Sequence, residues 1–375
     1  MRKLFFVVAA ALLMSLSGFT SAQDRGIAVS IAWSPDGDTI AVGSTTGVWL
    51  FDAEFEEVAH VELPEYAGNA PNTLDWNASG DLLALGYHYG SRRQGPGNTG
   101  QGIPILIVDV IQQNVVSTIE VKWLYSTIRW HPAENHILAG TLSGTTHIWD
   151  AITGQELFYF EESFGRENHG SRMTQSVCWL TESTIASIGG HATYILDVQE
   201  HKTLETVEDT PFVLVADCNK DGDVMMVLLS DVVVDARDVK RRYDDTKELR
   251  SASEIIRAAD VAWSPDGSQF VTNSTGCRVH VFDGRSKRIL AELEGSYSDF
   301  FGPPHYVDSI AWRPDGTRFA VVGQFDIRIW DAQSFELLHQ YNGFEIGYDQ
   351  GIRFAIELSE EERKKEMEEH GVKCT

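Results

Sequence analysis

Short runs in which apolar and polar residues alternate recur along most of this chain, and turn-forming residues separate them. In the first clear unit, Ser30–Asp52, an alternating run ends at Trp33, and the turn Ser34-Pro35-Asp36-Gly37 follows it. A second run covers Thr39–Gly43, and a third closes on Phe51-Asp52. Alternation with period two, bounded by Pro, Asp and Gly, is typical of short antiparallel strands. The unit therefore predicts three strands joined by tight turns.

The same unit can be aligned six more times along the chain, at intervals of roughly 40 to 55 residues. The positions equivalent to Trp33 are Trp76, Trp130, Trp179, Cys218, Trp263 and Trp312. Each unit closes on an apolar residue followed by Asp, and a fourth alternating run such as Ile289–Leu293 follows most of these pairs. Four strands per repeat at this period predict an all-β, seven-bladed β-propeller of four-stranded antiparallel blades.

Two of the closing dipeptides are Trp149-Asp150 and Trp330-Asp331, and they make the chain resemble the WD40-repeat β-propeller family. The resemblance covers about Ile27 to Asn342, and the Ser-Pro-Asp-Gly turn is common in bacterial members. No repeat carries the Gly-His pair that usually precedes the first strand, so the resemblance implies an incomplete His–Ser–Trp–Asp network. A TolB-like propeller, usually of six blades, is the alternative fold.

The two ends of the chain differ from the repeats. Arg2 and Lys3 precede the apolar run Leu4–Leu16, and Thr20-Ser21-Ala22 supplies small residues for cleavage. This pattern predicts a signal peptide over 1–22 and a secreted or periplasmic protein, with an uncleaved anchor as the alternative. The propeller is expected over 27–345. The tail, 346–375, is expected to hold a strand and then a short acidic C-terminal helix.

The chain is acidic, with a formal net charge of −25 at pH 7. Such a surface repels phosphate backbones, so a nucleic-acid partner is not expected. No segment after the signal is apolar for long enough to span a membrane. The propeller is expected to be monomeric.

The four cysteines are Cys178, Cys218, Cys277 and Cys374, and their spacings match no zinc or redox pattern. Cys178 and Cys218 fall on equivalent strands of successive repeats, so a bridge between them is conceivable. Because the sequence cannot establish the required geometry, the favoured interpretation is that they are small buried residues.

The three longest irregular stretches are Tyr87–Gly102, Glu161–Met173 and Gly295–Tyr306. In a WD40-like propeller all three would lie on one rim, the top rim, formed by the connections between fourth and first strands and between second and third strands. Long loops in compact domains often carry function, although they also simply cover the ends of blades. The candidate partner-binding residues are the loops' cations and aromatics: Arg92, Arg93, Arg166, His169, Arg172, Tyr297, Phe300, Phe301, His305 and Tyr306.

Metal and catalytic signals are weak. Asp217–Gly222 matches the first half of a calcium loop, but Leu228 stands where a bidentate Glu is expected, so an ordinary turn is favoured. His88, His169, His191 and His305 lie in different repeats and form no zinc motif. No Gly-x-Ser-x-Gly elbow is present, and turns explain the repeated Asp residues. No metal, cofactor or catalytic residue is predicted.

These patterns favour a non-catalytic platform that binds a protein or peptide through the top-rim loops. Two alternatives stay open. One is a propeller enzyme of the metal-dependent hydrolase or lactonase type, with its site at the mouth of the central channel. The other is a propeller that binds a small molecule or a glycan. The fold alone does not decide among them.

Overall fold

The fold is taken from a computed structural model of the chain. The structure describes residues 25–26, 28–63, 70–87, 104–122, 125–161, 173–189, 192–208, 213–219, 224–228, 233–235, 258–274, 278–295, 310–323 and 326–342. The predicted signal peptide, the tail and its helix lie outside these residues. Within the described part of the chain every regular element is a strand, and no helix there could cross a membrane.

The strands form antiparallel sheets, numbered here in chain order. The first holds β1 (Ala28–Trp33), β2 (Thr39–Ser44), β3 (Gly47–Asp52) and β4 (Glu57–Glu62), and the second β5 (Thr73–Trp76), β6 (Leu82–Gly86), β7 (Ile105–Asp109) and β8 (Asn114–Ile119). The third holds β9 (Tyr125–Trp130), β10 (His136–Thr141), β11 (Thr145–Asp150) and β12 (Glu156–Glu161). The fourth holds β13 (Thr174–Trp179), β14 (Thr184–Gly189), β15 (Ala192–Asp197) and β16 (Lys202–Glu208).

The fifth sheet holds β17 (Val213–Cys218), β18 (Val224–Leu228) and β19 (Val233–Asp235). The sixth holds β20 (Ala258–Trp263), β21 (Gln269–Ser274), β22 (Arg278–Asp283) and β23 (Ile289–Glu294), and the last β24 (Ile310–Trp312), β25 (Arg318–Val322), β26 (Ile327–Asp331) and β27 (Leu337–Tyr341). Four-stranded antiparallel blades are thus confirmed for six sheets. The prediction of seven such blades is not met by the fifth sheet, which has three strands among the described residues.

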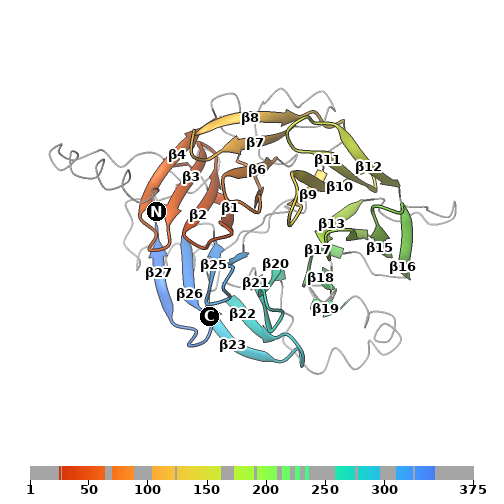
Figure 1. The fold of residues 1–375 in the computed structure, drawn as a ribbon. Coiled ribbons are helices and arrows are strands. Elements are labelled where there is room, and N and C mark those ends of the chain that lie inside the picture. The colour runs from red at the N-terminus through yellow and green to blue at the C-terminus, as the bar shows by residue number, and fades with distance from the viewer. Residues whose placement is uncertain are drawn as a thin grey trace, which may run out of the picture.

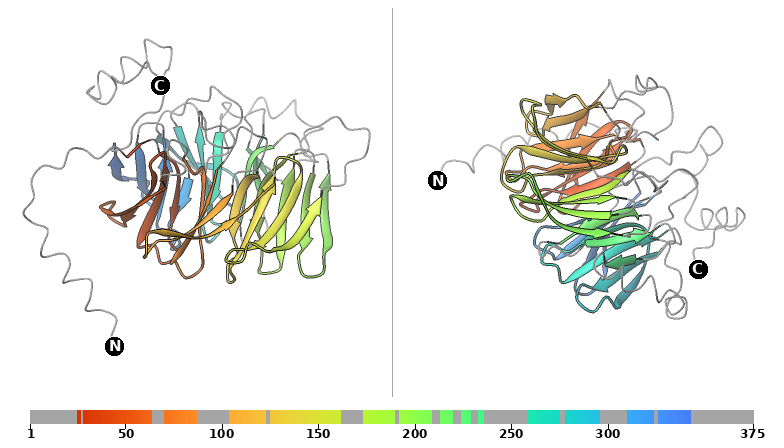
Figure 2. Two further views of the ribbon diagram at one scale, coloured as in Figure 1. Left: turned by 90° about the horizontal axis from the view of Figure 1, so that it is seen from above. Right: turned by 90° about the vertical axis from the view of Figure 1, so that its right-hand side faces the viewer.

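The sheets are arranged as blades around a central axis (Figure 1), and the side views show them within a single layer (Figure 2). The first strand of each sheet is innermost and contacts the first strand of the next, from β1 through β5, β9, β13, β17 and β20 to β24. β24 contacts β1 and closes the ring. Every sheet uses consecutive strands, so among the described residues closure exchanges no strand between the two ends of the propeller.

The tryptophans at the ends of the innermost strands pack between neighbouring blades. Trp76 is 6% exposed and lies in an apolar cluster with Ala41 and Leu50 of the first sheet. Trp33 packs in the same manner against Ile329 of the last sheet. These contacts bury large aromatic surfaces between adjacent sheets, and their burial is the main apolar contribution to the ring.

The predicted turn chemistry is also present. The Ser34 hydroxyl donates to Asp36 Oδ1 at 2.6 Å and accepts the Thr39 N–H at 2.9 Å. Gly37 adopts a φ of +74°, which favours glycine. After the third strand of each four-stranded blade the closing Asp caps the next turn. Asp331 Oδ1, for example, accepts the N–H groups of Gln333 and Ser334 at 3.0 and 2.7 Å.

A β-bulge recurs in the outermost strand of all six four-stranded blades. The pairing between third and fourth strands skips one residue of the fourth strand, directly after the residue that faces the closing apolar position. A bulge leaves its extra residue unpaired and re-aims its side chain. The skipped residues are all aliphatic and exposed: Val58, Val116, Leu157, Leu204, Leu290 and Leu338.

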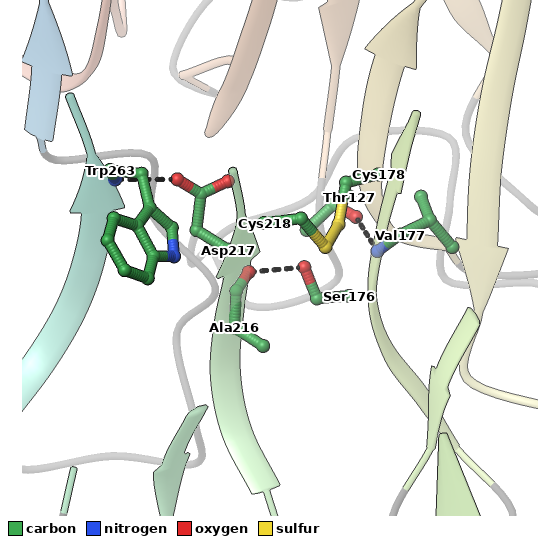
Figure 3. Close-up of a disulfide and its surroundings, with 8 residues drawn as sticks. All are labelled: Thr127, Ser176, Val177, Cys178, Ala216, Asp217, Cys218 and Trp263. Carbon is green, nitrogen blue, oxygen red and sulfur yellow. Dashed lines mark hydrogen bonds between the residues drawn. A yellow bond between two sulfur atoms is a disulfide. The ribbon is translucent and has the colours of Figure 1, made fainter. Parts of the chain in front are cut away.

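Side chains also bond neighbouring innermost strands to one another. Asp75 Oδ2 accepts the Trp130 N–H at 2.6 Å, Asp217 Oδ2 the Trp263 N–H at 2.8 Å, and Asp260 Oδ2 the Ile310 N–H at 3.1 Å. The Ser176 hydroxyl donates to the Ala216 carbonyl at 2.6 Å (Figure 3). These bonds satisfy polar backbone groups on the inner edge of the ring.

A disulfide joins Cys178 of β13 to Cys218 of β17, beside the Ser176–Ala216 hydrogen bond (Figure 3). The favoured interpretation of these two cysteines as free, small buried residues is therefore wrong. The two strands are adjacent in the ring, and the Cα atoms lie 6.1 Å apart, within the usual range for a disulfide. The bond occurs in the one repeat that has Cys218 in place of the blade tryptophan. It tethers the fifth sheet where that aromatic contact is missing.

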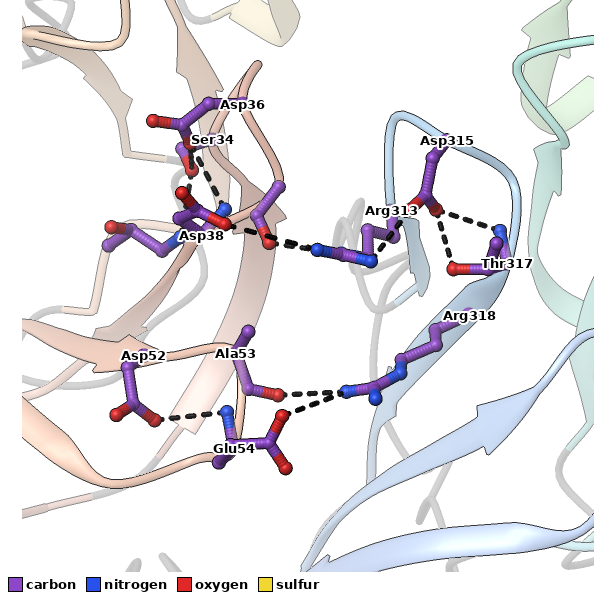
Figure 4. A network of polar contacts seen from close by, with 12 residues as sticks. Ser34, Asp36, Asp38, Asp52, Ala53, Glu54, Arg313, Asp315, Thr317 and Arg318 are labelled. Carbon is purple, nitrogen blue, oxygen red and sulfur yellow. Dashed lines mark hydrogen bonds and ion pairs between the residues drawn. The ribbon is translucent and has the colours of Figure 1, made fainter.

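The seam between the last and the first blade is closed by two arginines (Figure 4). Arg313 Nε donates to the Gly37 carbonyl at 3.0 Å, and Arg318 Nη1 donates to the Ala53 carbonyl at 3.0 Å. Arg313 is oriented by an ion pair with Asp315 at 2.6 Å. The seam therefore combines the Trp33 cluster with charge-assisted hydrogen bonds to backbone carbonyls.

We expect Arg313→Met to lower the free energy of unfolding by about 1–2 kcal/mol, because it removes a charge-assisted bond to a half-buried carbonyl. Urea unfolding followed by tryptophan fluorescence measures the change. Arg288→Met is the matched control, since Arg288 is exposed in the turn that precedes β23. Equal unfolding midpoints for the two variants would show that the arginine does not stabilise the seam.

We expect the double variant Cys178→Ser, Cys218→Ser to lose up to about 4 kcal/mol, because the bond closes a loop of 40 residues in the unfolded chain. A thiol reductant should shift the unfolding midpoint of the wild-type protein toward that of the variant. Non-reducing peptide mapping should recover the Cys178–Cys218 pair. Its absence from the oxidised protein would contradict the pairing.

Candidate functional site

All ten predicted partner-binding residues lie outside the described residues: Arg92, Arg93, Arg166, His169, Arg172, Tyr297, Phe300, Phe301, His305 and Tyr306. What the structure describes is the base of each loop that carries them. The bases lie at 87 and 104, at 161 and 173, and at 295 and 310. The contacts at these bases define how the top rim is supported.

Tyr125 holds both ends of the loop that carries Arg92 and Arg93. Its hydroxyl accepts the Tyr87 N–H at 2.8 Å and donates to the Pro104 carbonyl at 3.4 Å. Tyr87 and Tyr125 are each 1% exposed, so the bond between them is shielded from water, while the bond to Pro104 is partly buried. Because Tyr125 begins β9 of the next blade, a neighbouring sheet fixes the two ends of the loop relative to each other.

The loop that carries Phe300 and Phe301 is held at its base in a similar way. Arg328 of the last blade donates through Nη1 to the Glu294 carbonyl at 2.6 Å, where the loop begins. Its Nε pairs with Asp326 at 2.7 Å, and the Asp326 side chain is only 4% exposed. Where the loop ends, the Ile310 N–H is bound by Asp260 of the sixth sheet. Both ends are therefore anchored by charged groups from adjacent strands.

The third loop, which carries Arg166, His169 and Arg172, has a more exposed base. Glu161 pairs with Thr145 in the sheet, and its carboxylate accepts a hydrogen bond from the Tyr159 hydroxyl at 2.8 Å. On the other side Thr174 is fully buried. Only the C-terminal end of this loop is therefore held in the protein interior.

Sequence reasoning missed the residues that support these loops. Tyr125, Arg328 and Asp326 stand at the ends of strands, where alternation marks them only as strand residues. A weak signal was present, because Asp326 and Arg328 stand two residues apart at the start of a predicted strand and carry opposite charges. Nothing in the sequence indicates that Tyr125 would reach two positions in the preceding blade.

The repeated aspartates are structural, as predicted. The Ser34 hydroxyl and the Asp38 N–H, both donating to Asp36, lower the pKa of that carboxyl. The Ser334 N–H does the same to the pKa of Asp331. These carboxylates are already engaged as ionised acceptors within turns. They are not poised to exchange protons near neutral pH.

The calcium-like string has a partly structural role. Asp217, its first residue, accepts the Trp263 N–H across the blade interface, while 220–222 lie outside the described residues. Among the residues that the structure describes, no group of three or more His, Cys, Asp or Glu side chains could hold a metal ion. His88, His169, His191 and His305 all fall outside them.

With the ring and the loop bases established, comparisons with known proteins give the class. The family model described as "WD domain, G-beta repeat" matches residues 120–150, which run through β9, β10 and β11. Human F-box-like/WD repeat-containing protein TBL1Y is 28% identical over 138 residues, covering 33% of this chain and 24% of that protein. Actin-interacting protein 1 of Drosophila melanogaster is 30% identical over 93 residues, covering 24% of this chain and 14% of that protein.

Among solved structures, the β-propeller domain of Cps50 (Swd1) from Myceliophteria thermophila is similar in fold. Its TM-score is 0.62 at 12% identity, covering 82% of this chain and 97% of that domain. These matches support a WD40-repeat β-propeller family for the chain, through one matched repeat, partial sequence similarity and the propeller fold. It matches about a quarter or less of the length of the two curated relatives.

We expect Tyr125→Phe to loosen the Arg92–Arg93 loop, because it leaves the buried Tyr87 N–H and the partly buried Pro104 carbonyl without their hydroxyl partner, at a cost of about 1–3 kcal/mol. Trypsin cleavage after Arg92 and Arg93, followed by mass spectrometry, should become faster. Tyr159→Phe is the matched control, since its hydroxyl bond is exposed. Unchanged cleavage in Tyr125→Phe would show that the hydroxyl does not support this loop.

Proposed function

We propose that this protein is a non-catalytic interaction scaffold whose top-rim loops bind a protein or peptide partner. The observation that carries the proposal is the way two long loops are supported. Each is held at both of its ends by buried or charged side chains of adjacent strands, through Tyr125 in one case and Arg328 with Asp260 in the other. Rigid bases reduce the conformational entropy that loops lose when they bind.

The composition of these loops supports a protein partner. Arginine and aromatic residues dominate the binding energy of protein interfaces, and the supported loops carry Arg92, Arg93, Phe300 and Phe301. The family relationship points the same way, since one similar protein is named for its interaction with actin. The acidic chain favours a partner with neutral or basic contact surfaces.

The proposal includes the location and the blade count. We propose that residues 1–22 direct export to a secreted or periplasmic location, where the Cys178–Cys218 disulfide is stable. We further propose that the three-stranded fifth sheet is one blade of a seven-bladed ring. Its β17 contacts β13 on one side and β20 on the other, as innermost strands do throughout the ring.

The experiment that tests the proposal is affinity capture of the tagged mature protein from its own cell envelope. The variant Arg92→Ala, Arg93→Ala, Phe300→Ala, Phe301→Ala should recover at least about tenfold less partner than the wild-type protein, because it removes the expected anchors. The control Arg285→Ala, Arg288→Ala removes two exposed arginines from the opposite rim and should recover as much as wild type. Equal recovery by the loop variant would place the binding site elsewhere.

A further inference from the structure

The outer wall of the second and third blades departs from the pattern of the other blades. Every four-stranded blade exposes one aliphatic bulge residue, so an exposed Val116 or Leu157 is a property of the repeat. The turn before the outermost strand is different. Two residues after the closing Asp, the first, fourth, sixth and last sheets have the polar residues Glu54, Gln199, Arg285 and Gln333. The second and third sheets have Ile111 and Ile152, which are 77% and 50% exposed.

Both isoleucines are held outward by their turns. Asp109 Oδ1 accepts the N–H groups of Ile111 and Gln112 at 2.9 and 2.8 Å. Asp150 Oδ1 accepts those of Ile152 and Thr153 at 3.1 and 2.7 Å. The same carboxylate cap is present where the blades carry polar residues. The isoleucines are therefore exposed although their turns are ordered, and their apolar side chains remain in contact with water.

The outermost strand of the second blade, β8, connects these two turns. The Ser117 hydroxyl donates to the Ile152 carbonyl at 3.0 Å, which bonds β8 directly to the turn of the next blade. Val115 and the bulge residue Val116 precede Ser117 and are 39% and 44% exposed. The exposed apolar residues of β8 and of the two turns, Ile111, Val115, Val116 and Ile152, are called here the β8 patch.

The edge of β8 also lacks the usual protection. β8 is the outer strand of its sheet, and none of the described residues pairs with its outer edge. Its sequence, Asn-Val-Val-Ser-Thr-Ile, contains no titratable side chain. The other outermost strands, β4, β12, β16, β23 and β27, each contain Glu, Lys or His. Charged residues commonly keep exposed edges from pairing with other chains, so an uncharged apolar edge favours strand addition.

The charge around the patch identifies the kind of partner. The two hairpins 105–119 and 145–161 contain Asp109, Asp150, Glu156 and Glu161 and no lysine or arginine. The chain as a whole carries −25. A second copy of the chain would place like charges against each other, which costs free energy, whereas a basic partner gains attraction.

We propose that the β8 patch binds an extended segment of another protein that alternates aliphatic and basic residues, and that this segment adds a strand to β8. Its backbone pairs with the outer edge around Asn114–Val116. Its aliphatic side chains cover the valines and the two isoleucines, and its Lys or Arg side chains face the carboxylates. This surface is on the outer wall and does not depend on the top-rim loops.

The test uses a fluorescent peptide of about eight residues, the length of a strand, that alternates valine and lysine. Fluorescence anisotropy measures its affinity for the wild-type protein and for the variant Ile111→Gln, Val115→Thr, Ile152→Gln. These substitutions introduce the residues that the fourth blade has at the equivalent positions, Gln199 and Thr203, so they are compatible with a folded blade. They leave the net charge of the protein unchanged. We expect at least about tenfold weaker binding by the variant.

Ile289→Thr is the matched control, because Ile289 is the exposed equivalent of Val115 in the sixth sheet. It should bind the peptide as wild type does. Hydrogen exchange should slow in 114–116 when the peptide is bound and should stay unchanged in β16. A peptide that alternates proline and lysine keeps the charge but cannot pair as a strand, so it should not bind.

Three results would overturn the proposal. The first is equal affinity of the valine–lysine peptide for the wild-type protein and the triple variant. The second is equal binding of the proline–lysine peptide, which would show that net charge alone accounts for the interaction. The third is wild-type self-association in sedimentation that the triple variant abolishes, which would make the patch an interface between copies of this chain.

Discussion

The ring depends on how the innermost strands of neighbouring blades satisfy one another. Each of these strands pairs on one side only, so its other edge leaves polar backbone groups facing the centre of the ring. Side chains from the adjacent innermost strand supply partners: Asp75, Asp217 and Asp260 accept N–H groups, and Ser176 donates to a carbonyl. A buried backbone group without a partner would cost as much as a lost hydrogen bond. Adjacent blades are therefore bonded to each other by direction-specific contacts as well as by apolar packing.

Neighbouring blades are connected by other chemistry where the repeat is irregular. The fifth sheet lacks the blade tryptophan, and a covalent bond from Cys218 to Cys178 joins its innermost strand to the preceding one. At the seam, Arg313 and Arg318 reach across to backbone carbonyls of the first blade. Each substitute connects a blade to its neighbour rather than strengthening a sheet internally. The residues that depart from the repeat in these two places therefore form contacts between blades.

The local features of the fold were predictable, because short-range chemistry determines them. The Ser34–Gly37 turn, the Asp331 cap and the placement of Trp33 all follow from residues within one repeat. The Tyr125 contacts and the Arg328–Asp326 pair were not predictable, because they depend on which side chains of different blades come within bonding distance. For the same reason the sequence placed Cys178 and Cys218 on equivalent strands but could not establish their disulfide. In the fifth sheet the sequence predicted more than the structure shows. Its degenerate repeat predicted a four-stranded blade, and three strands are found among the described residues. For the candidate site, sequence indicated the loops, and the structure supplied only their supports.

Closure without strand exchange has a consequence for how this ring can be cut and rejoined. Because β1–β4 and β24–β27 are each built from consecutive residues, the interface between the last and first blades is formed in the same manner as every other interface. The junction between the first and last described blades is thus topologically equivalent to any other junction between two blades. A circularly permuted chain, opened between two other blades and joined across the seam, would preserve every strand pairing. In this architecture the order of the blades around the ring is fixed, but the blade at which the chain begins is arbitrary.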